Sequence, residues 1–521
     1  HYMKRILVFV LLLCAYAGAQ SYNPIGKGCT NAFYIDKDCD GYGVASPLGV
    51  DADDNDPEVN TPQTVIAKYG NLTNFLHHMG YYPDRIFYIA TNGSDDTGEV
   101  NNINNPYKTW DAVKPQLQQG DAVIFRGGVY DYLGDYPIGC SDLQGTEDKP
   151  IIIMSYPGEK AVIDSTETNI PITNSNYLIL DGFVLDNTQS SWGHGIGGYK
   201  YEHIIFRNLE MMHHSSGMHC THEYHILIEN CVIHDNPHSH GIYLNSYRPP
   251  YSTDITIRNC LMYRNGRHGF QQNGIATNIL FENNIVHSNA LGGVSLINGI
   301  KDSIFRNNLI FNNNKQGFVL YAYDCSYSDE GPNSNNLFVN NIVWLGKYNC
   351  GIGDSEPIWI PAIEFNDAHP ENLVYSGNIF RNNIFVSSGN PVFHFSQYKH
   401  FPSTTIENNI FYRIGGSDIV MSSPEGDWNL STMESQSSLV KNNLLADPKF
   451  TDVSIDYNLT PEKFNFDYLS DSPAINFGTI TGAPSTDLRG NSRIGNVDAG
   501  CYEYLPQNLT ILTSTLPQGI V

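Results

Sequence analysis

FENNIVHSNALGGVSLINGIKDSIFRNN, residues 281–308, begins and ends on the same short unit. The unit has an apolar residue, a charged residue and two asparagines, first as Phe281-Glu282-Asn283-Asn284 and again as Phe305-Arg306-Asn307-Asn308. Related units recur outward in both directions: Ile205-Phe206-Arg207-Asn208, Ile228-Glu229-Asn230-Cys231, Ile257-Arg258-Asn259-Cys260, Phe338-Val339-Asn340-Asn341, Phe380-Arg381-Asn382-Asn383, Ile406-Glu407-Asn408-Asn409 and Val440-Lys441-Asn442-Asn443. Between residues 208 and 307 the first asparagines are 22, 29, 24 and 24 residues apart, so the chain is a repeat with insertions.

The repeat predicts an all-β fold, a right-handed parallel β-helix over residues 85–505. Each unit holds short alternating strands rich in Ile, Val and Phe, and stacking is needed to bury their apolar faces. Asn at one fixed place per coil predicts a ladder of side-chain amides. We therefore expect Asn208, Asn230, Asn259, Asn283 and Asn307 at equivalent bends, in coils about 4.8 Å apart. Cys231 and Cys260 should then stack, either as a disulfide or as two buried thiols.

Composition excludes several classes of function. The 521 residues carry 29 Lys and Arg against 54 Asp and Glu, a formal net charge of −25. Such an acidic chain is a poor candidate for binding nucleic acid or anionic membranes, which requires basic surface. An acidic substrate would need a local basic strip. Hydrophobic residues make up 41%, enough for a large core.

The first residues predict export. Met3-Lys4-Arg5 precedes an apolar run from Ile6 to Tyr16, and Ala17-Gly18-Ala19 is a typical cleavage site. We predict a signal peptide at residues 3–19 and a secreted protein, extracellular or at the cell surface, with no membrane span. Residues 506–521 are expected to be a short C-terminal tail. Cys29 and Cys39 flank a turn, and a disulfide between them is plausible in an oxidising compartment.

Residues 20–60 form an Asp-rich module. Two groups of carboxylates are close in sequence, and a glycine follows the first: Asp36, Asp38, Asp40 and then Asp51, Asp53, Asp54. Alternating carboxylates followed by Gly41 can surround a hard cation, because calcium takes six to eight oxygen ligands. The module predicts a calcium cofactor; the other interpretation is a solvated acidic linker. The linker that follows, residues 61–84, should hold one short helix around Ala67 to His78.

Two resemblances refine this interpretation. The segment Asp36-Lys37-Asp38-Cys39-Asp40-Gly41 with its second Asp cluster resembles the thrombospondin type 3-like metal-binding repeats of secreted bacterial proteins. Residues 85–505 look like the secreted parallel β-helix proteins that include polysaccharide lyases, glycoside hydrolases and sugar epimerases. Gly127-Gly128-Val129-Tyr130 at the start and Asp498-Ala499-Gly500-Cys501 near the end are typical of them. This resemblance implies a polysaccharide partner and leaves the reaction open.

Histidines gather in the middle of the repeat. Twelve of the 18 lie between His194 and His287. A second register aligns Gly217, Gly241, Gly269, Gly293 and Gly317, nine to eleven residues after the unit Asn. Positions two and four residues after each Gly share a strand face. They predict one polar patch over three coils: His219, Thr221, Tyr243, Asn245, Gln271 and Asn273.

This patch is the predicted active site of a polysaccharide lyase. β-Elimination from a uronate needs a proton acceptor, a proton donor and a cation that neutralises the carboxylate. We assign catalysis to His240, Tyr243 and His268. Substrate binding is assigned to His219, Arg248, Arg264, Arg267, Gln271 and Asn273.

Three alternatives remain open at this point. A glycoside hydrolase of the same fold would need two carboxylates, for which Asp235 and Asp254 are candidates. A non-catalytic adhesin or matrix protein would use calcium to stiffen the chain. The histidines could instead hold a transition metal, since His213, His214, His219, His222 and His225 lie close in sequence.

Overall fold

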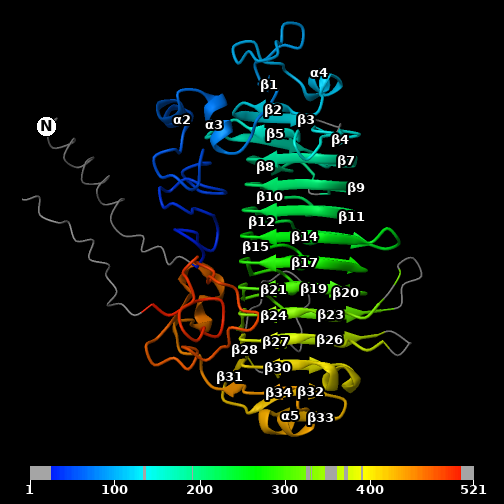
Figure 1. Cartoon of the computed structure of the whole chain (residues 1–521), viewed down its shortest axis with the longest axis vertical. Helices are drawn as coiled ribbons and strands as arrows, with labels where there is room; N and C mark the ends of the chain where they lie inside the picture. Colours follow the sequence, from blue (N-terminus) through cyan, green and yellow to red (C-terminus); the bar gives the residue numbers. More distant parts are fainter. Residues whose placement is uncertain are drawn as a thin grey trace, which may run out of the picture.

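The computed structural model describes residues 25–132, 137–190, 192–323, 329, 331–346, 361–368, 373–388 and 391–505. The predicted signal peptide, residues 20–24 and the tail at 506–521 lie outside these ranges. The described chain is a right-handed parallel β-helix, as the repeat predicts (Figure 1). Each coil contributes strands to three rows of hydrogen-bonded parallel strands, which we call rows 1, 2 and 3.

Row 1 opens each coil. Its strands are β4 (Cys140–Ser141), the first parts of β7 (Ile170–Asp181), β9 (His194–Arg207) and β11 (Ser216–Glu229), then β13 (Ile242–Ser246), β16 (Phe270–Gly274), β19 (Val294–Ile297), β23 (Phe318–Ala322), β26 (Ile363–Asp367), β29 (Phe393–Phe395) and β32 (Ile419–Ser423). An antiparallel strand, β33 (Gly426–Asn429), ends it.

Row 2 follows in each coil. It consists of β1 (Arg85–Ile89), β2 (Asp121–Phe125), β5 (Ile151–Ser155), the second parts of β7, β9 and β11, β14 (Ser252–Arg258), β17 (Ala276–Glu282), β20 (Ile300–Lys301), β21 (Ile304–Arg306), β24 (Leu337–Val339), β27 (Ile379–Arg381), β30 (Thr405–Glu407) and β34 (Val440–Lys441).

Row 3 completes the coil. It contains β3 (Gly128–Tyr132), β6 (Ala161–Ser165), β8 (Phe183–Asp186), β10 (Glu210–Met212), β12 (Val232–His234), β15 (Leu261–Tyr263), β18 (Ile285–His287), β22 (Leu309–Phe311), β25 (Ile342–Leu345), β28 (Ile384–Ser388), β31 (Ile410–Ile414) and β35 (Leu444–Leu445). The remaining elements are helices α2 (Pro62–Tyr69), α3 (Leu72–His78), α4 (Trp110–Val113) and α5 (Leu430–Gln436), 3-10 turns at Lys114–Gln116, Tyr398–Ser403, Ile455–Leu459 and Pro461–Lys463, and the antiparallel pair β36 (Phe450–Asp452) and β37 (Asn465–Tyr468).

The bend between rows 2 and 3 explains the repeated unit. The first Asn of every unit has a left-handed backbone, with φ between 53° and 56° from Asn208 to Asn442. Asn tolerates this conformation better than most residues. The five asparagines predicted at equivalent bends do occupy them, since their strands pair in register.

The continuous amide ladder is formed by the second residue of the unit, whereas the first Asn makes such bonds only in some coils, as from Asn382 to Asn340 at 3.2 Å. Asn308 donates from Nδ2 to Asn341 Oδ1 at 2.9 Å, and Asn341 donates in the same way to Asn383 at 3.0 Å. Asn284, Asn308, Asn341, Asn383 and Asn409 are fully buried because this position points into the helix, and Asn443 ends the ladder partly exposed. In two earlier coils Cys231 and Cys260 take the same position, and both are buried free thiols rather than a disulfide.

Two segments far apart in sequence cover the outer side of row 3. The Asp-rich module packs Ile25, Ala32 and Ile35 on it, and the segment around β36 and β37 packs Phe464 and Phe466 further along (Figure 1). Helices α2 and α3 pack against the first strands of row 2. The linker therefore has two helices where one was predicted, because Gly70, at φ 80°, ends α2.

None of the helices that the structure describes is long and apolar enough to span a lipid bilayer.

Candidate functional site

The outer side of row 1 brings distant residues into two columns. Strand alternation turns every second side chain outward. The side chains that alternate with these, such as Met218, Ile242 and Phe270, point inward and fill the core. The first column, read through the strand register, is Gly197, His219, Tyr243, Gln271, Ser295, Val319, Glu364, His394 and Ser422. The second is Tyr199, Thr221, Asn245, Asn273, Ile297, Tyr321 and Asn366.

Glycine at the entry to row 1 lets successive coils approach closely. A Cβ at Gly241 would lie 2.6 Å from the carbonyl oxygen of Gly269 in the next coil. A side chain there would force the coils apart. The Gly register found in the sequence is therefore a packing requirement that aligns the polar columns.

The predicted catalytic side chains form one aromatic cluster. The Tyr243 ring lies 4.8 Å from His240 and 4.9 Å from His219, measured between centroids. His240 and His268 stack in parallel at 5.3 Å in successive coils. His219 Nδ1 lies 3.2 Å from His194 Nε2, which extends the cluster by one coil.

Burial keeps these imidazoles uncharged. His240 is only 2% exposed, and burial lowers its pKa well below the ordinary value, helped by the nearby His268 and the Arg267 cation. Burial also lowers the pKa of His268 to about 3, with Arg267 as the next cause. The pKa of His219 is lowered by burial too. At neutral pH all three are therefore uncharged, and a ring nitrogen without a proton can accept a hydrogen bond.

Accessibility separates the predicted residues into two groups. Tyr243, His219 and His268 are partly exposed. Gln271 and Asn273 are 7% and 3% exposed, so they lie below the surface. Asn273 donates from Nδ2 to the Tyr243 hydroxyl at 3.3 Å. The Tyr243 and Tyr247 hydroxyl oxygens are 3.2 Å apart.

The three predicted arginines have different surroundings. Arg267 is exposed beside His240 and His268. Arg248 is exposed and makes no ion pair with any residue that the structure describes. Arg264 does not join them, because it directly follows β15 and remains on the row 3 side. There it makes two bonds to Asp235, at 2.7 and 2.8 Å, and lies over the Phe33 ring of the module.

An exposed aromatic ring that the sequence analysis missed stands at the same entry to row 1. Trp192 is 71% exposed, and its ring stacks on His238 at 4.5 Å with the planes 12° apart. Such a held, flat apolar surface suits the C–H face of a sugar ring. A lone Trp beside a glycine gives no periodic signal, so the repeat could not reveal it.

Glu364 and His394 were also missed, although they stand in the first column. The step from Val319 to Glu364 is 45 residues long, so an insertion hides the register. The alternation Ile363-Glu364-Phe365 was the only local signal, because it matches a strand with one polar outward position.

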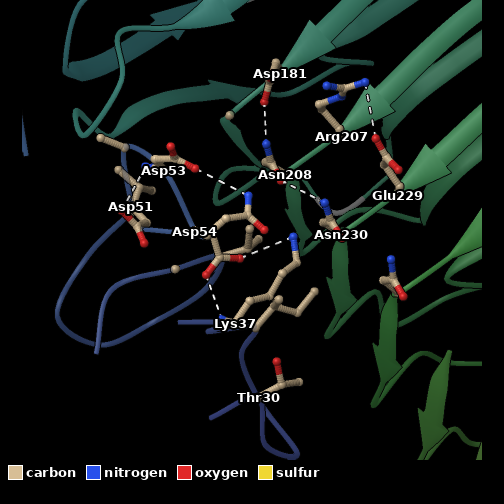
Figure 2. A pocket seen from close by; sticks show the side chains of 18 of the residues that line it. Thr30, Lys37, Asp51, Asp53, Asp54, Asp181, Arg207, Asn208, Glu229 and Asn230 are labelled. Atoms are coloured by element: carbon tan, nitrogen blue, oxygen red, sulfur yellow. Dashed lines mark hydrogen bonds and ion pairs between the residues drawn. The ribbon is translucent and has the colours of Figure 1, made fainter. Parts of the chain in front are cut away.

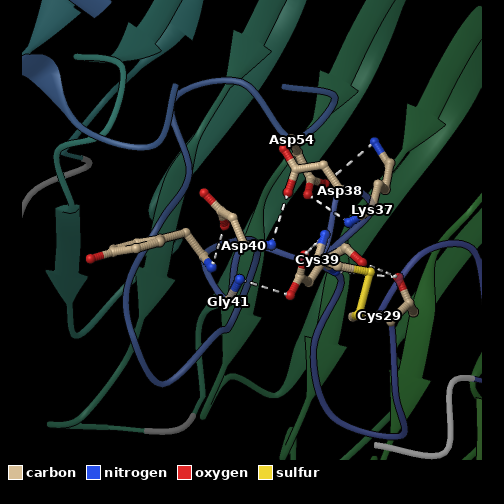
Figure 3. The surroundings of a disulfide bond; sticks show 10 residues. Cys29, Lys37, Asp38, Cys39, Asp40, Gly41 and Asp54 are labelled. Carbon is tan, nitrogen blue, oxygen red and sulfur yellow. Dashed lines mark hydrogen bonds and ion pairs between the residues drawn. A yellow bond between two sulfur atoms is a disulfide. The ribbon is translucent and has the colours of Figure 1, made fainter. Parts of the chain in front are cut away.

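The Asp-rich module is closed by the predicted disulfide, Cys29–Cys39, with Cα atoms 4.9 Å apart (Figure 3). Carboxylates gather beside it in two groups that share Asp38. The oxygens of each group lie within 4.8 Å of one another: Asp36, Asp38 and Asp40, and Asp38, Asp51 and Asp54. Asp53 belongs to neither and instead faces His78, with its Oδ2 3.3 Å from Nε2.

These carboxylates fit a cation. Oδ2 of Asp38, Asp40 and Asp51 is buried and accepts no hydrogen bond from the residues that the structure describes. Burial raises the pKa of Asp51 to about 8 and that of Asp54 to about 7. Crowded buried oxygens without donors are costly unless a cation or protons compensate them. Hard oxygen donors are the ligands that calcium prefers.

The histidines do not form a metal site within the described part of the chain, where ligand atoms converge only in the two Asp groups. His213 pairs with Asp186 at 2.7 Å, and His225 pairs with Asp254 at 3.3 Å. His222 bonds the Pro250 carbonyl oxygen at 2.7 Å. Each of these side chains is thus engaged with a different neighbour.

A cavity of about 350 Å³ lies where the module meets the β-helix (Figure 2). Lys37 and Asp54 line it from the module, and Arg207 and Glu229 line it from the helix. These groups pair with each other, Lys37 with Asp54 at 3.6 Å and Arg207 with Glu229 at 3.2 Å. The cavity is therefore part of the junction between the two parts.

Comparison with known proteins agrees with the architecture. A family model described as Pel9A-like, right handed beta helix region, matches residues 87–247. Another, described as periplasmic copper-binding protein (NosD), matches residues 168–399. No curated protein matches the sequence.

Similar solved structures include three carbohydrate-active enzymes. Pectate lyase Pel9A is 17% identical, over 82% of this chain and 98% of that chain, with a TM-score of 0.49. The alginate lyase from Paenibacillus sp. str. FPU-7 is 17% identical, over 52% and 92%, with a TM-score of 0.38. The GH136 lacto-N-biosidase from Eubacterium ramulus is 14% identical, over 74% and 71%, with a TM-score of 0.43. At these identities and scores they assign no activity to this chain.

Proposed function

We propose that this parallel β-helix protein is an exported lyase that binds an acidic polysaccharide on the outer side of row 1 and cleaves it by β-elimination. The observation that carries the proposal is one cluster in consecutive coils: Tyr243 contacts His219 and His240, His240 stacks on His268, and the exposed Arg267 lies beside His268. Arg267 supplies the local basic charge that an acidic polymer needs in a chain of net charge −25. Trp192 offers a stacking surface nearby.

The reaction assigns one role to each group. His268 accepts the proton from C5 of the uronate, and Arg267 pairs with the uronate carboxylate to make that proton more acidic. The Tyr243 hydroxyl donates a proton to the glycosidic oxygen as the C4–O bond breaks. The electron pair from the C5–H bond becomes the C4–C5 double bond, so the products are an unsaturated uronate and a new chain end.

His240 takes a supporting role in this proposal. At 2% exposure it lies beneath the surface that a polymer would touch. It stacks on His268, and its Nδ1 accepts the backbone N–H of His268 at 3.3 Å. We assign it to positioning His268. Gln271 and Asn273 are likewise buried, and Asn273 positions the Tyr243 hydroxyl.

Calcium is the proposed cofactor of the Asp-rich module. Asp36, Asp38, Asp40, Asp51 and Asp54 would hold it, because their oxygens converge and Oδ2 of Asp38, Asp40, Asp51 and Asp54 is buried without a hydrogen-bond donor in the described part of the chain. The cation would neutralise carboxylates that repel one another and so stabilise the module on row 3. The Cys29–Cys39 disulfide supports the proposed secretion, since such bonds persist in oxidising compartments.

Product analysis on a panel of uronate polysaccharides tests the reaction. The proposal predicts ultraviolet absorbance from the conjugated double bond, rising in step with new reducing ends. A hydrolase would release reducing ends without that absorbance. The absence of both signals on every polymer of the panel would favour a non-catalytic surface protein.

A further inference from the structure

A second polar cluster lies on the outer side of row 1, beyond the proposed active site. The register of row 1 leads from Tyr243 to Glu364 in four steps, and His394 follows in the next coil. Coils stack about 4.8 Å apart, so Glu364 lies about 19 Å from Tyr243 along the helix. Between them Ser295 and Val319 are 1% and 7% exposed, which separates the two clusters.

The Glu364 carboxylate is held in place without being neutralised. Its Oε2 accepts a hydrogen bond from Gln316 Nε2, and its Oε1 accepts one from Asn366 Nδ2 at 3.1 Å. Glu364 has no ion pair with any residue that the structure describes, and it is partly exposed. A carboxylate has about four acceptor positions, so two remain for donors from a ligand.

The neighbours of Glu364 complete a hydrogen-bonding site. His394 stands beside it in the next coil, and its Nδ1 lies 2.9 Å from the Ser422 hydroxyl, which orients the ring. Tyr321 pairs in register with Asn366 and places a partly exposed ring at the edge. Carboxylate, imidazole and amide groups next to a phenol ring match the hydroxyls and the C–H face of a pyranose.

Charge distinguishes this cluster from the one around Tyr243. Lys399, five residues after His394, is bound to the buried Asp367 at 2.7 Å. Lys315, which directly precedes Gln316, contributes to the lowered pKa of His268. A uronate would meet the unneutralised charge of Glu364, whereas Arg267 stands exposed at the other cluster. Like charges at close range repel, so the Glu364 cluster favours an uncharged sugar.

We propose that Glu364, Asn366, His394 and Tyr321 form a subsite for a neutral sugar. The inference rests on the proposed function, because it makes the substrate an acidic polysaccharide that also contains neutral residues. One polymer chain that follows row 1 over this distance of about 19 Å would place its uronate at Tyr243 and its neutral sugar at Glu364.

Affinity electrophoresis in gels that contain a polysaccharide tests this subsite. The probes are polygalacturonate and alginate, which contain only uronates, and gellan and rhamnogalacturonan, which also contain neutral sugars. All proteins carry Tyr243→Phe, so that the polymer stays intact. The variants are Glu364→Gln, Arg267→Ala and, as the matched control, Glu425→Gln, an exposed carboxylate in the β32–β33 turn. Thermal melting confirms that each variant is folded.

We expect the protein to bind at least one mixed polymer more tightly than either uronate polymer. Glu364→Gln should weaken that binding about tenfold, because a hydrogen bond to a charged acceptor is lost. It should also strengthen binding to the uronate polymers, because the repulsion is removed. Arg267→Ala should weaken binding to every acidic polymer, and Glu425→Gln should change nothing.

Three outcomes would overturn the inference. The neutral subsite is contradicted if the protein with Glu364 intact binds polygalacturonate or alginate as tightly as the mixed polymers, or more tightly. Binding that Arg267→Ala weakens and Glu364→Gln leaves unchanged refutes the subsite alone and leaves the proposed function standing. A protein that binds none of the four polymers refutes both.

Discussion

The two neighbouring residues of each asparagine unit have different roles. Asn408 has φ 56° and provides a left-handed bend, whereas Asn409 is fully buried and belongs to the amide ladder. Asn409 Oδ1 accepts the backbone N–H and the side-chain amide of Asn383, both at 2.9 Å. Its Nδ2 donates to the Phe380 carbonyl oxygen at 2.8 Å. The left-handed conformation is common to all the first residues, some of which also form side-chain hydrogen bonds, whereas buried hydrogen bonding selects the second.

This division predicts opposite tolerances at adjacent positions. Asn409→Ala should lower the free energy of unfolding by at least about 2 kcal/mol, because buried donors and an acceptor lose their partners. Asn408→Gly should be nearly neutral, and Asn408→Ala should cost about 1 kcal/mol through the left-handed backbone. Denaturant unfolding of the three variants measures this. If Asn408→Gly lowered the free energy of unfolding more than Asn409→Ala, the two roles would have to be exchanged.

The low pKa of His268 predicts an unusual pH profile. Its pKa is lowered to about 3, so the ring stays uncharged throughout the range above about pH 4. We expect kcat/KM to show no acid limb near pH 6.5, where an ordinary histidine would lose about tenfold per pH unit. Rates between pH 5 and 8, with circular dichroism to monitor folding, provide the measurement. A fall in kcat/KM on acidification that is centred near pH 6.5 would show that a His268 with a strongly lowered pKa is not the base.

At the scale of elements, the turn between rows 3 and 1 determines which polar residues meet. Arg264 and Arg267 are three residues apart, yet one pairs with Asp235 beside the module and the other is exposed beside His268. The sequence placed both in one patch because spacing alone does not locate the corner between them. In the module the spacing was more informative, since five of six predicted carboxylates converge and only Asp53 turns away.

Asp51 and Asp53 form a matched pair for testing calcium. Asp51 has a buried oxygen without a donor, and Asp53 faces His78. Calcium should protect residues 25–60 from proteolysis in the wild type and in Asp53→Asn, while the β-helix stays intact with or without EGTA. Asp51→Asn should need at least about tenfold more calcium for the same protection. Identical digestion with and without calcium in the wild type would support the acidic-linker interpretation.

At the scale of the whole molecule, the repeat predicted most of the architecture. The unit recurs from Asn208 to Asn442, and stacking follows from it directly because each coil contacts mainly its neighbours. The candidate site was less predictable. Glu364 was hidden by a long insertion, the burial of His240 depends on what covers it, and Trp192 has no repeat partner. Periodicity reports where a side chain points, but it does not report what lies over it.

Buried uncharged histidines should make the folded protein sensitive to acid. His214 and His287 are fully buried, and burial lowers the pKa of each to about 3. Below pH 6.5 the unfolded chain binds protons that the folded chain does not, so stability falls as the pH falls. Each of them should cost about 2 kcal/mol at pH 5. Burial raises the pKa of Glu223 to about 8 and that of Asp498 to about 6, and these two groups act in the opposite direction. Because the lowered pKa values of His194, His240 and His268 add to the loss, the unfolding midpoint in denaturant, measured in saturating calcium, should still decrease from pH 7 to pH 5. A constant or rising midpoint would contradict this linkage.

The central claim is that the outer side of row 1 around Tyr243 cleaves an acidic polysaccharide. The most direct measurement is the rate of double-bond formation on the best polymer by the wild type, Tyr243→Phe and Arg267→Ala, with Arg264→Ala as the control on the row 3 side. We predict that Tyr243→Phe lowers kcat about 10²–10⁴-fold with little change in melting temperature. Arg267→Ala should lower kcat/KM, and Arg264→Ala should retain activity. The claim would be contradicted if folded Tyr243→Phe formed double bonds at the wild-type rate. It would also be contradicted if Tyr243→Phe lost activity only because it unfolded.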